Sequence, residues 1–303
     1  MWQCPPVQVV YLGGIGRSGT TLLERLLGEV PGVVPLGEVV HLWERGVIGA
    51  ESCGCGVAFP ECPFWAKVGE QAFGQWSEAL AYRMLLLRRR VDRTRHIPPR
   101  RSVDLMEYVE RYRRIYQAAA EVADCAVVID SSKHASLAFC LVAAGVDVHV
   151  VHVVRDPRGV AYSWLRRVER PEDGAPMTRW GPVRTSLHWM AQNLALELLA
   201  ARGARVTRVR YEDLLDAPRR TLARLLLRLG LASPLRFLGN RRAMLGVGHT
   251  VSGNPMRFTA GAVELVRDDT WRSGLSRSRR WLVLALTWPL MIRYGYCPRG
   301  AAP

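Results

Sequence analysis

GGIGRSGTT, residues 13–21, lies between an apolar run, VQVVYL (7–12), and TTLLERLLGEV (20–30), whose leucines recur at helical spacing. An unbroken apolar, β-branched run that ends in glycines is typical of a strand buried on both faces, so the order is strand, tight loop and helix. The first N–H groups of such a helix and the positive end of its dipole face the loop. The sequence therefore predicts an anion-binding loop here rather than a plain glycine-rich turn.

This loop has the frame of a phosphate-binding loop but lacks that loop's lysine. In the pattern G-x-x-x-x-G-K-[ST], Gly14 and Gly19 take the glycine positions and Thr21 takes the hydroxyl position. Thr20 stands where the lysine is expected. The loop still carries a cation, because Arg17 lies inside it.

The same residues also satisfy a second pattern. Gly14, Gly16 and Gly19 spell G-x-G-x-x-G, the fingerprint of a dinucleotide-binding loop. Glu38 follows roughly 20 positions further on, where a ribose-binding carboxylate would lie. The loop alone leaves both interpretations open.

Strand-like apolar runs alternate with helical patterns along the chain. This alternation predicts an α/β fold, with one P-loop-like, three-layer domain over residues 1–303, a central parallel sheet of about five strands, and helices on both faces. The expected strands are 7–12, 33–36, 126–130, 148–154 and 205–210, and the expected helices are 75–92, 104–122, 134–144, 157–169, 184–202, 217–229 and 275–293. We expect the insertion at about 44–122 to form a substrate wall or lid over the carboxyl ends of the strands.

Composition argues against several classes of protein. The net charge of +15 comes almost wholly from arginine, which supplies 40 of the 42 basic residues, a bias typical of a GC-rich genome. The densest basic cluster (83–101) has no interleaved aromatic residues, so we predict no nucleic-acid partner.

The longest apolar run, WLVLALTWPLMI (281–292), is too short for a membrane span and contains Pro289, which predicts a buried C-terminal helix. We expect a cytoplasmic protein without a signal peptide; peripheral membrane contact and the oligomeric state stay open.

Three of the seven cysteines lie close together in SCGCGVAFPECPFW (52–65): Cys53, Cys55 and Cys62. A zinc site needs four ligands, usually from C-x2-C pairs, and this stretch offers three at a different spacing. A disulfide within the loop is sterically possible but unusual in a cytoplasmic protein. Reduced thiols, a disulfide and a metal site all remain open, and the sequence assigns no metal ligand.

VVHVVRDPRGVAYSWL (150–165) marks a second functional strand end. Its strand ends at Arg155, Asp156 can cap the next helix, and Pro157 fits the first helical position. Ser163 lies about two turns into that helix, from where it could reach the same ligand as Arg155. The pair is suited to a second phosphate group, although an ion pair between Arg155 and Asp156 is the alternative.

Two further stretches are candidates for the site. VVIDSSKHA (127–135) places Lys133 beside the glycine loop, where a compact charge could neutralise a developing oxyanion, unless the stretch is only a helix start capped by serine. TVSGNPMRF (250–258) holds Ser252, Asn254 and Arg257 in a polar loop that suits an anion, and a surface turn is the alternative.

Together the motifs resemble those of sulfotransferases that use 3′-phosphoadenosine 5′-phosphosulfate (PAPS), over about residues 7–40 and 126–260. VVRDPRGVAYS (153–163) resembles the family's 3′-phosphate motif, with Arg155 and Ser163 at the family's eight-residue spacing. An arginine in the loop looks closer to the tyrosylprotein and carbohydrate branches than to the cytosolic aryl branch. GRSGTTLLERLL (16–27) resembles the 5′-phosphosulfate loop, which implies these donor-binding residues: Gly16, Arg17, Ser18, Gly19, Thr20 and Thr21.

The resemblance also implies catalytic residues. In the tyrosylprotein branch a glycine and a glutamate follow the loop arginine, and the glutamate is the base; here Gly37 and Glu38 follow Arg17. Lys133 falls where that branch has a lysine near the donor's leaving oxygen. VRYEDL (209–214) looks like a late strand with a tyrosine, which implies that Tyr211 lies at the donor site.

The expected reaction is transfer of a sulfuryl group from PAPS to a hydroxyl by in-line displacement with a general base, leaving 3′-phosphoadenosine 5′-phosphate (PAP). His41 and His134 are the rival bases to Glu38. A sulfuryl group is less charged than a phosphoryl group, so backbone amides and Arg17 can hold the donor and we expect no metal requirement. The acceptor, a small molecule, a carbohydrate or a tyrosine-like group, stays open. The alternative is a P-loop-like kinase that uses ATP and Mg²⁺.

Overall fold

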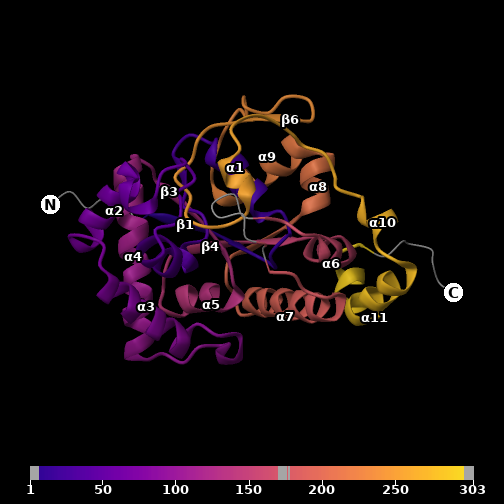
Figure 1. Ribbon diagram of the computed structural model, residues 1–303, viewed down its shortest axis with the longest axis horizontal. Helices are drawn as coiled ribbons and strands as arrows, with labels where there is room; N and C mark the ends of the chain where they lie inside the picture. Colours follow the sequence, from indigo (N-terminus) through magenta and orange to yellow (C-terminus); the bar gives the residue numbers. More distant parts are fainter. Residues whose placement is uncertain (1–6, 170–175, 177, 297–303) are drawn as a thin grey trace.

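The computed structural model describes residues 7–169, 176 and 178–296. Its centre is a five-stranded parallel sheet in the order β2-β3-β1-β4-β5 (Figure 1). The strands are β1 Gln8–Gly13, β2 Val33–Pro35, β3 Val127–Lys133, β4 Val148–Val154 and β5 Val206–Arg210. The predicted fold class, a parallel sheet of about five strands with helices around it, is confirmed.

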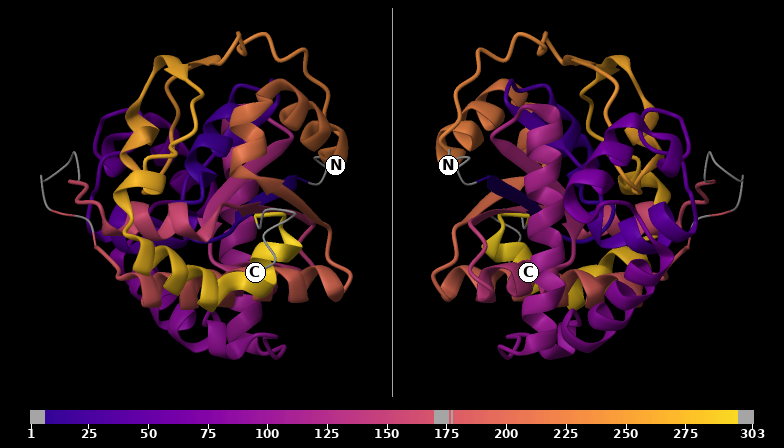
Figure 2. Two further views of the ribbon diagram at one scale, coloured as in Figure 1. Left: turned by 90° about the vertical axis from the view of Figure 1, so that its right-hand side faces the viewer. Right: turned by 90° about the vertical axis from the view of Figure 1, so that its left-hand side faces the viewer.

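Alternate side chains of β1 enter different cores on the two faces of the sheet. Val9 and Tyr11 pack in one hydrophobic core, whereas Val10 and Leu12 pack in the other. The first core is covered by α4 (Val103–Ala123), α5 (Ala135–Ala143) and α7 (Pro182–Ala201). The second core is covered by α1 (Thr20–Gly28), α8 (Tyr211–Asp216) and α9 (Pro218–Leu229). The side views show these helical layers above and below the strands (Figure 2).

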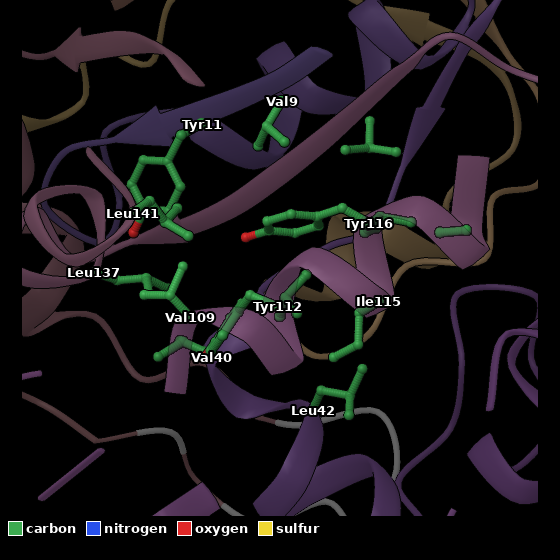
Figure 3. Packing of buried hydrophobic residues seen from close by; sticks show 14 of the residues in the cluster. Val9, Tyr11, Val40, Leu42, Val109, Tyr112, Ile115, Tyr116, Leu137 and Leu141 are labelled. Atoms are coloured by element: carbon green, nitrogen blue, oxygen red, sulfur yellow. The ribbon is translucent and has the colours of Figure 1, made fainter. Parts of the chain in front are cut away.

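Tyrosines of α4 join the insertion to the core of the sheet (Figure 3). The hydroxyl of Tyr116 donates a hydrogen bond of 2.6 Å to Oδ2 of Asp130 in β3. Asp130 is fully buried, and burial raises its pKa to about 6. The hydroxyl of Tyr11 donates to the carbonyl of His134 at 2.7 Å. These contacts fix the chain on either side of Lys133.

The segment between β2 and β3 contains three α-helices, α2 (Pro63–Phe73), α3 (Glu78–Val91) and α4, besides short 3-10 and π-helical turns. Helix α3 begins at Glu78, later than the predicted residue 75, because Ser77 caps it by accepting a hydrogen bond from the N–H of Leu80. Helix α2 was not expected from the helical pattern. It lies beside α4 at the edge of the molecule (Figure 1). The role of this segment as a substrate wall stays a prediction.

Other boundaries differ from expectation. Strand β3 runs three residues beyond the predicted 126–130, and the helix expected over 157–169 ends at Leu165 (α6, Pro157–Leu165). The cap predicted for α6 is confirmed, since the Asp156 carboxylate accepts from the N–H of Arg158 at 2.9 Å. A hairpin of β6 (Arg242–Leu245) and β7 (Gly261–Glu264) was not predicted.

The C-terminal helix α11 (Arg277–Arg293) forms as expected, but the prediction that it is buried was wrong. One face, with Val283 and Met291, packs inward, whereas Trp281 and Trp288 are 69% and 55% exposed. The helix lies along α7 and α6 at the surface, so only the face that packs against these helices is buried (Figure 1). Across the described ranges, no helix is both long and apolar enough to cross a membrane.

Candidate functional site

The glycine loop adopts a conformation that most side chains would prevent. Gly19 has φ +89°, and a Cβ there would lie 2.4 Å from Cδ2 of Tyr211. Gly14 has φ +153°, and a Cβ there would lie 2.6 Å from the carbonyl oxygen of Val153. Arg17 also has a positive φ, 73°. Gly19 caps α1 without a side-chain hydrogen bond, so the first N–H groups of the helix have no intrahelical partner and suit an anion.

The loop opens onto a cavity of about 750 Å³ at the carboxyl ends of the strands. This volume falls within the range of sites for nucleotide-sized ligands. Basic side chains outnumber carboxylates in the lining, which favours an anionic ligand. The basic residues are Arg17, Arg45, Arg88, Arg93, Lys133 and Arg155, and the carboxylates are Glu38, Asp92 and Glu264.

Arg155 sits where β4 meets α6, against the glycine loop. Its Nη1 donates to the carbonyl of Arg17 at 3.0 Å, and its guanidinium lies 4.3 Å from the ring centroid of Tyr211. Nη2 of Arg155 is 3.8 Å from a carboxylate oxygen of Asp268. Ser163 lines the same cavity. Arg155, Ser163 and Tyr211 thus all line the cavity onto which the loop opens, and their role in binding a donor stays a prediction.

Arg17 also lines the cavity, and its side chain lies against an aromatic pair. Its guanidinium is 5.6 Å from the ring centroid of Trp164, and the indole N–H of Trp164 donates to the carbonyl of Gly16 at 3.0 Å. Trp164 stacks on Trp180 at a centroid distance of 3.9 Å. Burial lowers the pKa of Arg17, and the nearby charge of Glu38 opposes this effect. The tryptophan pair was not predicted, because Trp180 lies beyond the motif that contains Trp164.

Glu38 and Lys133 form an ion pair inside the cavity. Nζ of Lys133 contacts Oε1 of Glu38, and Nε2 of His41 is 3.7 Å from Oε2 of the same carboxylate. Lys133 has φ +71°, an unusual value for a residue with a side chain, at a point where β3 shifts register against β1. The ring of His134 lies edge-on to that of His41, at a centroid distance of 6.1 Å. Two strand ends therefore bring a carboxylate, an ammonium and two imidazoles together.

The environment determines which of these groups carries charge. Burial alone would raise the pKa of Glu38, but the charge and the hydrogen bond of Lys133 oppose this effect, and the pKa lies below its usual value. Burial lowers the pKa of His41 to about 3, against the opposing effect of Glu38. Burial likewise lowers the pKa of His134. At neutral pH the cluster consists of a carboxylate beside two neutral imidazoles.

The three residues of the 250–258 loop that were predicted to bind an anion make hydrogen bonds within the protein. Oγ of Ser252 accepts a hydrogen bond from Nη1 of Arg45 at 2.7 Å. Arg257 is buried, and its Nη1 donates to the carbonyl of Thr250 at 3.1 Å. Asn254 lines the cavity, whereas Ser252 and Arg257 do not. The oxygen of Asn254 accepts from the N–H of Met256 at 3.0 Å. Their role in binding an anion stays a prediction.

Comparison with known proteins gives structural neighbours only. No protein-family model matches the chain, and no curated protein matches it. Five solved structures that resemble it are described as sulfotransferases. A sulfotransferase domain of the olefin synthase of Synechococcus PCC 7002 has a TM-score of 0.49 and 18% identity, over 94% of this chain and 98% of that one. A sulfotransferase domain of the curacin biosynthetic pathway has a TM-score of 0.49 and 15% identity, over 93% and 98%.

Sequence reasoning missed two charged residues that support the site, Glu24 and Arg25 of α1, both of which are buried. Oε1 of Glu24 accepts from the N–H of Gly37 at 2.7 Å, and Oε2 accepts from the hydroxyl of Ser131 at 2.8 Å. The carboxylate thus joins the strand ends that carry Glu38 and Lys133. Burial raises the pKa of Glu24 to about 7, although both hydrogen bonds oppose the rise. In the sequence this residue looks like an exposed position between leucines.

Arg25 supports the other side of the site. Its Nη2 donates to the carbonyls of Gly246 at 2.6 Å and Thr259 at 2.7 Å, and its Nη1 donates to the carbonyl of Arg257. Gly246 and Thr259 flank the polar loop 250–258, and Arg257 lies within it. A buried arginine with several carbonyl partners stiffens a loop that has little regular structure of its own. Helix α1 therefore orients both the strand ends and this loop.

Proposed function

We propose that the protein transfers a sulfuryl group from PAPS to a hydroxyl of a small-molecule, carbohydrate or tyrosine-like acceptor. The observation that carries this proposal is the ion pair of Glu38 and Lys133, inside the cavity and beside an anion loop that has no lysine. The reaction needs a base for the acceptor and a cation for the leaving oxygen. Both groups stand within one cavity that also offers two arginines for the donor's anionic groups.

The donor's two charged ends match two parts of the cavity. The N–H groups at the start of α1, with Arg17, Thr20 and Thr21, would hold the 5′-phosphosulfate. Arg155, assisted by Ser163, would hold the 3′-phosphate at the start of α6, and Tyr211 would pack beside it. The guanidinium of Arg155 already contacts the loop carbonyl of Arg17, which keeps the two anion positions at a fixed separation.

In the proposed reaction Glu38 accepts the proton of the acceptor hydroxyl as the new S–O bond forms. The bond from sulfur to the phosphate oxygen breaks at the same time, and Lys133 neutralises the charge that develops on that oxygen. When Lys133 turns to the donor, Glu38 loses its main charge partner. Burial then raises the pKa of Glu38, because desolvation disfavours a lone carboxylate. The exchange of partners would thus make Glu38 a stronger base once the donor is bound.

We propose the insertion as part of the acceptor wall. Arg88 at the end of α3, and Asp92, Arg93 and Thr94 after it, line the same cavity as the glycine loop. Nη1 of Arg88 donates to the carbonyl of Val40, 3.2 Å away, next to His41. The insertion therefore reaches the same strand end as the proposed base, where the acceptor hydroxyl must lie.

Calorimetry tests the donor assignment. PAP should bind with a Kd in the micromolar range or better in the presence of EDTA, and ATP should bind at least tenfold more weakly with or without Mg²⁺. The reason is that the loop lacks the lysine that serves a nucleoside triphosphate and holds a second anion position at Arg155. Tight ATP binding that requires Mg²⁺ would instead favour the kinase alternative.

Replacing Arg155 by Ala should raise KM for PAPS by roughly 10- to 100-fold, with a smaller change in kcat. A hydrogen bond to a charged group contributes about 1.5–3 kcal/mol, which corresponds to this range. Initial rates at varied PAPS concentration measure the effect. Arg166→Ala is a matched control, because Arg166 also approaches Asp268 at 3.8 Å but is exposed and does not line the cavity. An unchanged KM in Arg155→Ala would remove this residue from the donor site.

A further inference from the structure

Three cysteines of the loop 52–62 meet a histidine that lies almost 200 residues later in the chain. The ligand atoms of Cys53, Cys55, Cys62 and His249 all lie within 4.8 Å of one another. Nδ1 of His249 is 3.2 Å from Sγ of Cys62 and 3.9 Å from Sγ of Cys53. Sγ of Cys55 is 3.7 Å from Sγ of Cys62.

These separations are close to those of a tetrahedral zinc site. With Zn–S near 2.3 Å and Zn–N near 2.0–2.1 Å, tetrahedral angles place two sulfurs about 3.8 Å apart and a sulfur and a nitrogen about 3.5 Å apart. The sulfur–sulfur distance between Cys55 and Cys62 matches, and the two distances from His249 bracket the expected value. A disulfide would need two of the sulfurs at about 2.0 Å.

The backbone brings the two segments together at Gly54, between the first two cysteines. The N–H of Gly54 donates to the carbonyl of Thr250 at 2.9 Å. A Cβ on Gly54 would lie 2.6 Å from the carbonyl oxygen of Gly248 and 2.6 Å from Oγ1 of Thr250, so a side chain there would push the segments apart. The glycine of the C-G-C motif is therefore what allows His249 to reach the thiols.

Aromatic residues of α2 hold the histidine in place. The ring of Phe64 stacks on that of His249 at a centroid distance of 5.2 Å and an interplanar angle of 17°. The indole N–H of Trp65 donates to the carbonyl of His249 at 2.8 Å. Both residues lie within three positions after Cys62 in the sequence. The ligand histidine is thus oriented by the segment that carries the third cysteine.

We propose that Cys53, Cys55, Cys62 and His249 bind a structural zinc ion. Three thiols and an imidazole are a ligand set that zinc prefers, and four protein ligands close the coordination sphere, as in structural rather than catalytic sites. None of the four residues lines the cavity at the glycine loop. The proposal is therefore independent of the proposed sulfuryl transfer.

The position of the ion gives it a defined structural effect. It joins the loop 52–62 to the segment that contains His249, and two residues later the carbonyl of Val251 accepts the N–H of Glu38 at 2.8 Å. The N–H of Val251 donates in turn to the carbonyl of Leu36 at 2.8 Å. Zinc would hold the segment that pairs with the end of β2, so its loss should loosen the part of the chain that carries Glu38.

Metal content and cobalt substitution test the site in the wild-type protein. Protein purified without chelator should contain about one zinc ion per chain, as measured by inductively coupled plasma mass spectrometry. The Co²⁺ form should show thiolate-to-cobalt charge-transfer absorption and the intense visible bands of tetrahedral cobalt. A protein with no zinc and no such bands, or with a disulfide between two of the three cysteines, would overturn the proposal.

Two variants locate the ligands. Cys55→Ser changes the least buried of the three thiols and should reduce bound zinc at least tenfold under competition with a chelator, and His249→Ala should do the same. Cys125→Ser is the control, since Cys125 is a partly buried thiol outside the cluster, and it should retain the full zinc content. Retention of zinc in Cys55→Ser and His249→Ala would contradict the assignment. If either variant does not fold, the wild-type cobalt spectrum decides.

Discussion

Replacing Glu38 by Gln should lower kcat by about 10²- to 10⁴-fold, the range that a positioned general base contributes. Gln has almost the same shape as Glu but cannot accept a proton, so the acceptor hydroxyl would attack without activation. The affinity for PAP should stay equal or increase, because Lys133 then has no carboxylate partner to leave. Steady-state kinetics and calorimetry measure the two quantities separately.

The matched variants for this prediction are His41→Gln and His134→Gln. His41 contacts the same carboxylate, but burial lowers its pKa to about 3, so protonating its imidazole is costly. We expect each histidine variant to keep kcat within about tenfold of the wild type, well above the loss expected of a missing base. Near-normal turnover in Glu38→Gln, together with a loss of 10²-fold or more in His41→Gln or His134→Gln, would transfer the role of base to that histidine.

Lys133→Met should lower kcat by about 10²- to 10³-fold, the cost of removing one group that stabilises a developing oxyanion. Met keeps an unbranched side chain of similar length but has no charge, so charge on the leaving phosphate oxygen would develop without a counter-ion. KM for PAPS should change less than kcat, because the charge on that oxygen grows in the transition state. Initial rates at saturating donor measure the effect.

Lys67→Met is the control, because Lys67 is the other lysine of the chain and is exposed on α2. It should keep the wild-type rate. Lys133→Met also frees Glu38 from its ion pair, which favours a higher pKa of this carboxylate in the free enzyme. The acidic limb of the pH profile should therefore move to higher pH. A normal kcat with a shifted pH profile would show that Lys133 only balances the charge of Glu38.

The parts of the site that follow from local sequence were predictable. The glycine loop, the Arg155 strand end and the Asp156 cap depend on residues that are neighbours in the chain, and their backbone preferences are strong. Lys133 was predicted at the sheet edge, although its left-handed backbone conformation was not. The pairing of Lys133 with Glu38 follows from the parallel sheet, since β2 and β3 are adjacent and their carboxyl ends meet.

The parts that depend on distant contacts could not be read in this way. The sequence around His249 gives no sign of its cysteine partners, because His249 reaches them only where Gly54 packs closely against the segment 248–250. Glu24 occupies a position between leucines where a surface charge is ordinary, and only the strand ends above it provide its two donors. The exposure of Trp281 and Trp288 was also missed. An apolar run predicts burial, but it does not show how many faces of the helix pack against other elements.

The central place of β1 in the sheet has a consequence for synthesis of the chain. Its hydrogen-bonded neighbours are β3 and β4, and Gln8 pairs with Val127 while Val9 pairs with Val148. At translation rates of about 5–20 residues per second, the ribosome needs roughly 6–25 seconds after β1 to produce β3. During that interval an apolar strand has two unpaired edges, a state that favours aggregation. The soluble yield in the cell should therefore depend strongly on chaperone supply and growth temperature. The thermodynamic stability of the folded protein should depend on them less.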